Sequence, residues 1–350
     1  MTQNTPYINT PAVQLWNGDA LEILKQMPDN SVDHIICDPP YELGFARNAA
    51  AGNWDKTGIA FNVELWTEAL RVIKPGGNLL AAGATRTYHR LAVAIEDAGF
   101  EIRDSINWIY AQGMPKSLEL AKSLTKSGHP ELAEQYQGWE TQLKPSFEPW
   151  VVARKPMSTS LTQNIIDWGV GGLNIDAVRI PTDESTARRN GDTEASTWKI
   201  ERTTEWSTGH TGGRWPTNTV FTHSEDCIED GACDAQCPVA ALSAHARQTD
   251  PARFFPAFRY ESKARGKERP QKGSKEEHAT IKPLKLMDFL VQLVAAPGQT
   301  VLDIFAGSGT TMEACIDNNV NTIGIELEEA HLASIEERLE RAFARKAVAA

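Results

Sequence analysis

The stretch VDHIICDPPYELG, residues 32–44, joins a run of strand-forming residues to an acid, two prolines and a tyrosine. Its first half predicts a buried strand, because β-branched and apolar residues dominate it. Pro39 and Pro40 end this strand, since proline donates no backbone hydrogen bond and restricts the residue before it. The stretch therefore predicts a strand whose carboxyl end presents Asp38 and Tyr41 from a rigid turn, although a plain strand and proline turn is the simpler reading.

Strands and helices alternate around this stretch. Hydrophobic spacing predicts helices at 20–28, 61–74, 87–99, 283–296, 310–319 and 328–348, and strands at 13–19, 32–38, 78–83, 100–111, 300–305 and 321–327. Repeated strand-then-helix order predicts an α/β fold with a parallel, doubly wound sheet. The periodicity fades in a central region rich in Gly, Thr, Trp and Pro. We therefore expect one domain built from residues 1–155 and 271–350, interrupted by a loop-rich insertion at 156–270.

The overall composition is that of a soluble globular protein, with 41% hydrophobic and 23% charged residues. No apolar run approaches the ~20 residues that a membrane-spanning helix needs, so we expect no membrane partner. The first residues, MTQNTPYINTPAV, lack the basic and apolar segments of a secretion signal. These features together predict a cytoplasmic protein.

The net charge of −11 argues against general affinity for nucleic acid, but the charge is uneven. Residues 253–285 contain ten Lys or Arg and four Glu. Such a basic strip can hold phosphates while the rest of the chain stays acidic. A solvated loop would have the same composition, so charge alone leaves both readings open.

A second motif, VLDIFAGSGTT at 301–311, predicts a strand, a glycine-rich turn and a helix. Gly307 and Gly309 allow the backbone to approach a ligand, and the helix N-terminus offers free amide groups. The motif is not a dinucleotide fingerprint, because Met312 stands where the third glycine belongs, and it lacks the lysine of a P-loop. Glu326, at the end of the next strand, can accept hydrogen bonds from ribose hydroxyls, although an acid near a helix start is the simpler reading. The pair indicates a nucleoside cofactor.

The residues Asp38 to Tyr41 suit the activation of an exocyclic amine. The Asp38 carboxylate and the Pro39 carbonyl can accept both hydrogens of an amino group, and Tyr41 offers a flat face on which a base stacks. Such an amine is a poor nucleophile, because its lone pair is delocalised into the ring. Acceptors that draw its hydrogens out of the plane would localise that pair toward an electrophilic methyl group.

Asp38-Pro39-Pro40-Tyr41 together with the segment FAGSG at 305–309 resembles the amino-methylating DNA methyltransferases that use S-adenosylmethionine. The catalytic tetrapeptide precedes the cofactor loop, and this circularly permuted order resembles their β group. The resemblance extends over about 10–155 and 255–335. It implies a Rossmann-like, seven-stranded sheet with target-reading parts in the insertion, and it makes Asp38, Pro39, Pro40 and Tyr41 the catalytic residues.

The same resemblance implies which residues hold the cofactor. The segment NGDALEIL approaches its adenine, and the segment HATIKPLK lies near its methionine end. By this resemblance the cofactor-binding residues are Asp19, Ala20, Asp38, His278, Thr280, Lys282, Asp303, Phe305, Ala306, Gly307, Ser308, Gly309, Thr310, Thr311 and Glu326.

The implied function is site-specific transfer of a methyl group to N6 of an adenine flipped from double-stranded DNA. Asp at the first position favours adenine, and N4 of cytosine is the alternative. C5-cytosine methylation requires a Pro-Cys thiolate, whereas the chain has only the reversed pair Cys237-Pro238. A nicotinamide oxidoreductase or a zinc-dependent DNA-binding protein would leave the Asp38 motif unexplained. The resemblance also makes a homodimer and a cognate restriction endonuclease candidate partners, and implies a bacterial or phage-encoded enzyme at the nucleoid.

A group of soft ligands lies in the central region, at His223, Cys227, Cys233 and Cys237. The spacing His-x3-Cys-x5-Cys-x3-Cys suits a tetrahedral structural zinc, which would cross-link a region with little core of its own. His245 is a substitute ligand, and unrelated free thiols are the alternative.

Candidate DNA contacts also lie mainly in the insertion. Trp198, Trp206 and Trp215 alternate with Arg202 and Arg214, a pattern that suits base or backbone contacts. The same residues could form a small core under the loops. Lys116, in a loop after a predicted strand, is a further candidate, with a solvated lysine as the alternative.

Overall fold

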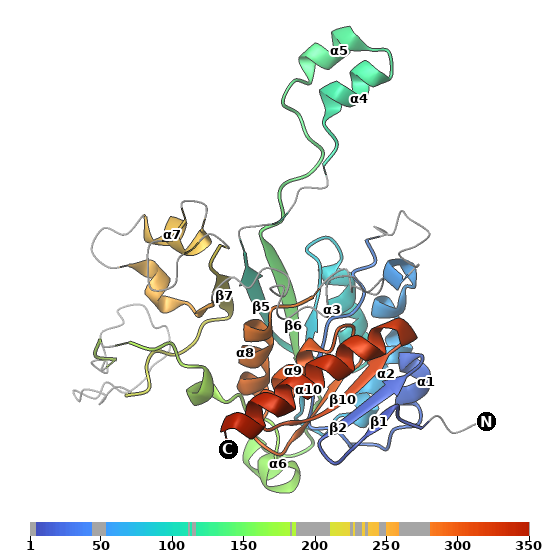
Figure 1. Cartoon of the computed structure of the whole chain (residues 1–350), viewed down its shortest axis with the longest axis vertical. Coiled ribbons are helices and arrows are strands. Elements are labelled where there is room, and N and C mark those ends of the chain that lie inside the picture. Colours follow the sequence, from blue (N-terminus) through green and yellow to red (C-terminus); the bar gives the residue numbers. More distant parts are fainter. Residues whose placement is uncertain are drawn as a thin grey trace.

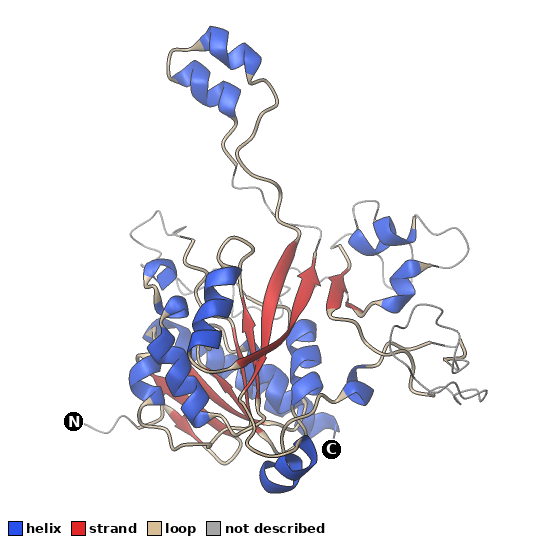
Figure 2. Cartoon of the chain, turned by 180° about the vertical axis from the view of Figure 1, so that it is seen from behind, coloured by secondary structure: helices blue, strands red, loops and turns tan. Residues whose placement is uncertain are grey.

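The computed structural model describes residues 5–43, 54–110, 113, 117–182, 184–186, 211–224, 227, 233–234, 237–244, 250–258 and 281–349. Helices pack on both sides of a central sheet, and a separate arm extends away from this body (Figures 1 and 2). Among the described residues, no helix combines the length and the apolar character needed to span a bilayer.

The described residues form one mixed sheet of ten strands. In spatial order these are β1 (Ile8–Asn9), β2 (Val13–Asn17), β10 (Asn321–Glu326), β9 (Thr300–Asp303), β3 (His34–Cys37), β4 (Asn78–Ala82), β6 (Phe147–Arg154), β5 (Glu101–Ile109), β7 (Thr219–Thr222) and β8 (Ala257–Phe258). Two strands from the C-terminal part of the chain, β10 and β9, lie in the sheet between the N-terminal strands β2 and β3.

The sheet is mixed, so the expectation of a parallel sheet is confirmed only in part. The five strands β2, β10, β9, β3 and β4 are parallel, but β6 runs antiparallel to both of its neighbours and β1 antiparallel to β2. The chain passes from β5 to β6 through the arm, which contains α4 (Leu120–Lys126) and α5 (Pro130–Gln135). Adjacent strands joined without a crossover helix on the sheet face pair antiparallel. The spacing does not predict β6, because Pro149 interrupts its apolar run.

The seven strands from β2 to β5 correspond to the expected seven-stranded sheet, and short strands extend it at both edges. β7 and β8 come from the predicted insertion at 156–270, yet they pair in the same sheet beside β5. The division into a catalytic domain and a target-recognition insertion stays a prediction.

Two apolar cores lie on opposite faces of the sheet. Ile35 and Cys37 of β3 face the core formed with α1 (Ala20–Leu24), α2 (Val63–Val72) and α3 (Tyr88–Asp97). Ile36 faces the core formed with α8 (Leu284–Val294) and α9 (Thr310–Asp317). The alternation follows from the two-residue period of a strand. The C-terminal helix α10 (Leu332–Ala349) packs against β2 and α9, on the same face of the sheet as α9 (Figure 1).

The remaining described α-helices belong to the central region. They are α6 (Leu161–Trp168) and α7 (Pro238–Ser243), with short 3-10 turns at Ile175–Val178 and Pro251–Phe254. α7 lies in a lobe beside β7 and β8, apart from the main body (Figure 1). This lobe has its own small core, formed by Phe221, Cys237, Val239 and Ala252.

Candidate active site

The Asp38 loop and the glycine-rich loop lie side by side at one edge of the sheet. β3 and β9 are parallel neighbours, with His34 opposite Val301 and Ile35 opposite Leu302. Because the carboxyl ends of parallel strands meet at the same edge, the residues that follow Cys37 and Asp303 emerge together. Two segments separated by more than half of the chain thus form one site.

Four side chains form a hydrogen-bonded cluster at this edge. The Lys282 ammonium lies 2.5 Å from Asp38 Oδ2, and it donates to the Tyr41 hydroxyl at 3.0 Å. The Tyr41 hydroxyl in turn donates to Glu148 Oε2 at 2.8 Å, and Lys282 Nζ is 3.4 Å from the same oxygen. Lys282 was expected near the cofactor, and the structure places it against Asp38. Glu148, near the start of β6, was not expected in the site.

The surroundings fix the ionisation of this cluster. Burial by itself lowers the pKa of Lys282, but the carboxylates of Asp38 and Glu148 raise it above the ordinary lysine value. Burial, with the negative charges of the same two acids, raises the pKa of Tyr41 well above its ordinary value. At neutral pH Lys282 is therefore a cation and Tyr41 a neutral phenol.

The second oxygen of Asp38 has a different status. Asp38 Oδ1 is buried and has no hydrogen-bond partner among the described residues. A buried carboxylate oxygen without a donor is unfavourable, because it loses its hydrogen bonds to water without replacement. Asp38 therefore has one oxygen engaged by Lys282 and one ready to accept a hydrogen from a ligand.

The turn after Asp38 is held in place from two sides. Thr87 donates its hydroxyl to the Tyr41 carbonyl at 2.9 Å, and the Tyr41 ring packs against the core that contains Trp108 and Ile36. Glu42 then adopts the left-handed conformation, with φ of 55°. Positive φ is uncommon for a residue with a side chain, and such positions cluster at functional sites. The expected stacking of a base on Tyr41 stays a prediction.

The glycine-rich turn is built by hydrogen bonds to the neighbouring strand. The Gly307 amide donates to Glu326 Oε2 at 2.7 Å, and the Ala306 amide donates to the Ile325 carbonyl at 2.8 Å. Gly307 and Gly309 have φ of 54° and 80°, which glycine adopts readily. Glu326, at the carboxyl end of β10, therefore shapes the turn itself.

Glu326 also accepts hydrogen bonds through its other oxygen. Oε1 receives the Glu328 amide at 2.9 Å and lies 3.0 Å from His331 Nδ1. A carboxylate has about four acceptor positions. The Gly307 amide, the Glu328 amide and His331 occupy three of them. A ribose hydroxyl would therefore share Glu326 with these groups or displace one of them.

Asp303 is the buried acid between the two loops. Its Oδ1 accepts a hydrogen bond from the Phe305 amide at 3.1 Å. Burial, together with the negative charges of Asp38 and Glu326, raises the pKa of Asp303 to about 7. Hydrogen bonds from Thr311 and the Phe305 amide act in the opposite direction and lower this pKa. The edge thus combines three carboxyl groups that sense one another, an environment that suits a cationic ligand.

The other predicted cofactor residues have observed structural contacts. Asp19 caps α1, because its carboxylate accepts the Glu22 amide at 3.1 Å, and Ala20 is the first residue of that helix. Ser308 and Thr310 are buried, with their hydroxyls 3.2 Å apart. A cap and a packed helix start explain these positions without a ligand, so their binding roles stay predictions.

Gly309→Ala tests how closely the turn is packed. A Cβ at this position would lie 3.0 Å from Ile335 Cγ2 on α10, at a φ of 80°. Gly298 has a φ of 85° and no atom within 4 Å of the position that a Cβ would take. Its replacement therefore measures the cost of the backbone conformation alone. We expect Gly298→Ala to lower the free energy of unfolding by about 1 kcal/mol and Gly309→Ala by roughly 2–4 kcal/mol. Urea denaturation measures both, and equal losses would show that Ile335 does not restrict the turn.

Several predicted site residues lie outside the described residues. These are His278, Thr280, Lys116, Trp198, Arg202, Trp206 and the substitute ligand His245. Of the remaining candidate DNA contacts, Trp215 is 65% exposed. Arg214 is paired with Glu184 at 2.7 Å and lies over the Phe254 ring. The DNA-contacting role of both stays a prediction.

The four predicted metal ligands lie together in the lobe beside β7. The donor atoms of His223, Cys227, Cys233 and Cys237 all lie within 4.8 Å of one another. His223 Nδ1 is 3.4 Å from Cys233 Sγ and 3.6 Å from Cys237 Sγ. A tetrahedral zinc, with bonds of about 2.3 Å to sulfur and about 2.0 Å to nitrogen, separates such donors by about 3.5 Å. The donor set and its spacing therefore fit zinc.

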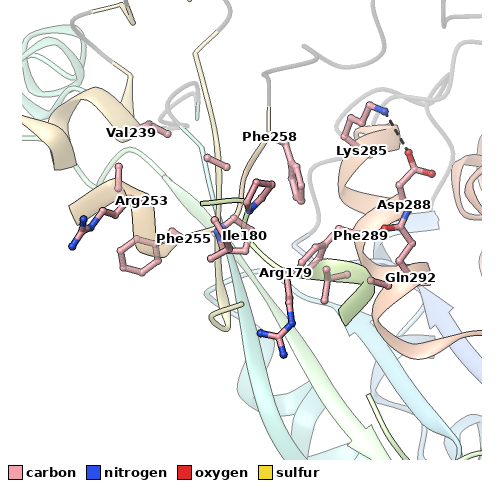
Figure 3. Close-up of a pocket in the computed structure, with 16 residues that line it drawn as sticks. Arg179, Ile180, Val239, Arg253, Phe255, Phe258, Lys285, Asp288, Phe289 and Gln292 are labelled. Atoms are coloured by element: carbon pink, nitrogen blue, oxygen red, sulfur yellow. Dashed lines mark ion pairs between the residues drawn. The ribbon is translucent and has the colours of Figure 1, made fainter. Parts of the chain in front are cut away.

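A hollow of about 500 Å³ lies between this lobe and α8 (Figure 3), and Asp38 is not among the residues that line it. Phe258 and Phe289 both line it and pack against each other, with ring centroids 5.5 Å apart. Lys285 and Asp288 form an ion pair of 3.9 Å at one side. None of the predicted catalytic, cofactor or metal residues lines it.

The comparisons with known proteins agree with this geometry. A family model for N6/N4 methyltransferases, described as DNA methylase, matches residues 32–337. The chain is 24% identical over 350 residues to the type II methyltransferase M.HindIII of Haemophilus influenzae, covering 89% of this chain and 90% of that protein. It is 30% identical over 117 residues to M2.DpnII of Streptococcus pneumoniae, covering 29% of this chain and 44% of that protein.

One solved structure shares the fold. The PvuII DNA methyltransferase, described as cytosine-N4-specific, superposes with a TM-score of 0.53 at 15% identity, covering 96% of this chain and 89% of that one. The described sheet and its helices are therefore of the kind found in a DNA methyltransferase.

Proposed function

We propose that this chain, which belongs to the DNA methylase family of amino-methyltransferases, transfers a methyl group from S-adenosylmethionine to N6 of an adenine in double-stranded DNA. The family membership supports DNA as the substrate and an exocyclic amine as the acceptor. The choice of adenine, the residues that act and the recognition sequence are proposals. N4 of cytosine is the alternative acceptor, and it is the position for which the PvuII enzyme is specific.

The observation that carries the proposal is the buried Oδ1 of Asp38 beside the glycine-rich turn, which has no hydrogen-bond partner in the described part of the chain. A buried oxygen that lacks a donor suits the amino group of an extruded base. With Lys282 held on Oδ2, Asp38 remains a carboxylate acceptor while Oδ1 receives an amine hydrogen. The Pro39 carbonyl would accept the second hydrogen, and the Tyr41 ring would stack on the base.

Residues around the glycine-rich turn would hold the cofactor. Asp303 and Glu326 place two carboxyl groups at the edge of the sheet, and Gly307 and Gly309 add no side chain to the turn. When bound, S-adenosylmethionine supplies an electrophilic methyl group on a cationic sulfonium. Asp38 would keep the amine lone pair directed at that methyl group and stabilise the positive charge that the amine acquires.

The described residues offer no competing thiolate at this site. Cys37 directly precedes Asp38, but it is fully buried, and burial raises the pKa of its thiol well above the ordinary value. A protonated, inaccessible thiol is a poor nucleophile. This property supports an amine acceptor over C5 of cytosine.

Long-read sequencing of DNA from cells that express the protein tests the function. We expect N6-methyladenine within one short recognition sequence, and none in cells that carry the empty vector. Methylation at N4 of cytosine would establish the alternative base. Unmodified DNA, in cells that contain the folded protein, would contradict the proposal.

We also propose a structural zinc at His223, Cys227, Cys233 and Cys237. The donor set and the separations of its atoms support it. The ion would join the loop after β7 to the first turn of α7, which starts at Pro238 directly after Cys237. It would stabilise the lobe and have no catalytic role.

The wider setting of the enzyme follows from the same proposal. The β-group motif order, with Asp38 before the glycine-rich turn, would be a circular permutation of the fold, and residues 156–270 would read the target. The type II methyltransferases among the relatives support a place in restriction and modification, with a cognate endonuclease. A homodimer and a location at the nucleoid in the cytoplasm complete the proposal.

A further inference from the structure

β6 brings an acid to the active site from the direction opposite to the other strands. Because β6 is antiparallel to β4, its first residues reach the edge at which the parallel strands end. The pairing of Ala82 with Trp150 places Glu148 just beyond the carboxyl end of β4. Glu148 therefore lies level with the residues that follow β3.

Glu148 touches both partners of the catalytic acid. Its Oε2 accepts the Tyr41 hydroxyl at 2.8 Å and lies 3.4 Å from Lys282 Nζ. The ammonium is thus shared between two carboxylates, those of Asp38 and Glu148. The Lys282 side chain is only 9% exposed, so its position depends on these contacts and not on water.

The charges of the cluster give Glu148 a further effect. Two carboxylates and one ammonium leave a net charge of −1, whereas without Glu148 the pair Asp38 and Lys282 would be neutral. An amine that receives a methyl group becomes positive until it loses a proton. A fixed negative charge stabilises that state more than a neutral cluster does.

Resting on the proposed function, we propose that Glu148 is a positioning residue for methyl transfer. It anchors the Tyr41 hydroxyl, holds Lys282 on Oδ2 of Asp38 so that Oδ1 stays available, and keeps the cluster negative. In the step itself the amine lone pair forms the new N–C bond and the electrons of the C–S bond remain on sulfur. One amine proton then passes to Asp38 Oδ1 and from there to water, so Glu148 takes up no proton.

Glu148→Gln tests this role, because glutamine keeps the shape and the acceptor for Tyr41 but removes the charge. In single-turnover reactions on the same duplex, we expect the methyl-transfer rate constant to fall roughly tenfold to a hundredfold. The dissociation constants for S-adenosylmethionine and for DNA should change less than about threefold, and Glu148→Asp should recover part of the rate. Glu101→Gln, at the far end of the sheet, is the matched control and should leave the rate unchanged.

A double-mutant cycle separates positioning from general stability. If Glu148 acts through the Tyr41 hydroxyl, adding Glu148→Gln to Tyr41→Phe should cost less than it costs in the unmodified chain. A wild-type rate in Glu148→Gln would overturn the inference, and so would a loss confined to binding or explained by a lower melting temperature. Absence of methyl transfer by the unmodified chain would instead refute the proposed function, and the inference with it.

Discussion

Replacing Asp38 by alanine is expected to abolish measurable methyl transfer, a loss of at least about a thousandfold, while the chain still binds S-adenosylmethionine. Alanine removes both the unpartnered Oδ1 and the oxygen that contacts Lys282. The amine would then lack its anionic acceptor, and its lone pair would stay delocalised in the base. Single-turnover kinetics and calorimetric titration of the cofactor measure the two effects separately.

The controls for this prediction address the buried cation. Asp38→Ala leaves Lys282 with Glu148 as its remaining described carboxylate partner, and this can lower stability. Asp38→Asn keeps the shape of the side chain and should lose most of the rate with a smaller change in melting temperature. Asp97→Ala changes an exposed acid at the end of α3 and should be neutral. A rate for Asp38→Ala within tenfold of the unmodified chain would contradict the proposed role.

Removal of the proposed zinc is expected to destabilise the lobe beside β7. We predict one zinc ion per chain, and near-complete loss of the ion in Cys237→Ser, because Cys237 is the buried member of the predicted ligand set and lies at the start of α7. Binding to a structural site of this kind contributes on the order of 10 kcal/mol, so its loss should unfold a lobe with such a small core. Elemental analysis measures the metal, and limited proteolysis reports the unfolding of 219–258.

A matched cysteine makes the zinc prediction specific. Cys315, on α9, is fully buried but lies in the main core, so Cys315→Ala should retain the zinc and the protease resistance of the lobe. A purified chain without zinc, or a Cys237→Ser variant that keeps the ion, would show that the four donors do not form a metal site.

The centre of the fold could be predicted because its determinants are local. The apolar runs before Asp38 and before Gly307 each end in residues that stop a strand, and the parallel pairing of β3 with β9 then brings the two turns together. The helices at 63–72 and 284–294 begin and end within three residues of their predicted limits. Periodicity, turn residues and the strand-helix order were sufficient for these elements.

Glu148 could not be predicted by the same reasoning. Asp38, Asp303 and Glu326 lie at or just after the carboxyl ends of parallel strands, where site residues are expected. Glu148 lies near the start of β6, and an antiparallel strand brings its first residues to that same edge. The direction of β6 follows from its pairing with β4, a contact between residues 78–82 and 150–154. Local sequence carries no record of that pairing, and Pro149 obscures the strand itself.

The strands of the central region were harder to predict from the sequence, for a related reason. β7 and β8 are short. β7 joins residues 107–109 of β5 to 219–221, and β8 joins 221–222 of β7 to 257–258. Strands this brief carry little periodicity. The His and Cys spacing could be recognised because ligands of a metal site are defined by chemistry and not by hydrophobic pattern.

The position of the transferred methyl group tests directly whether the protein methylates the exocyclic amine of adenine. Duplex DNA is incubated with the full chain and S-adenosylmethionine labelled in its methyl group, then digested to nucleosides for mass spectrometry. We predict label on the exocyclic amine of adenine, and none with Asp38→Ala. Label at C5 of cytosine, or no label on DNA from a folded chain that binds the cofactor, would contradict the account.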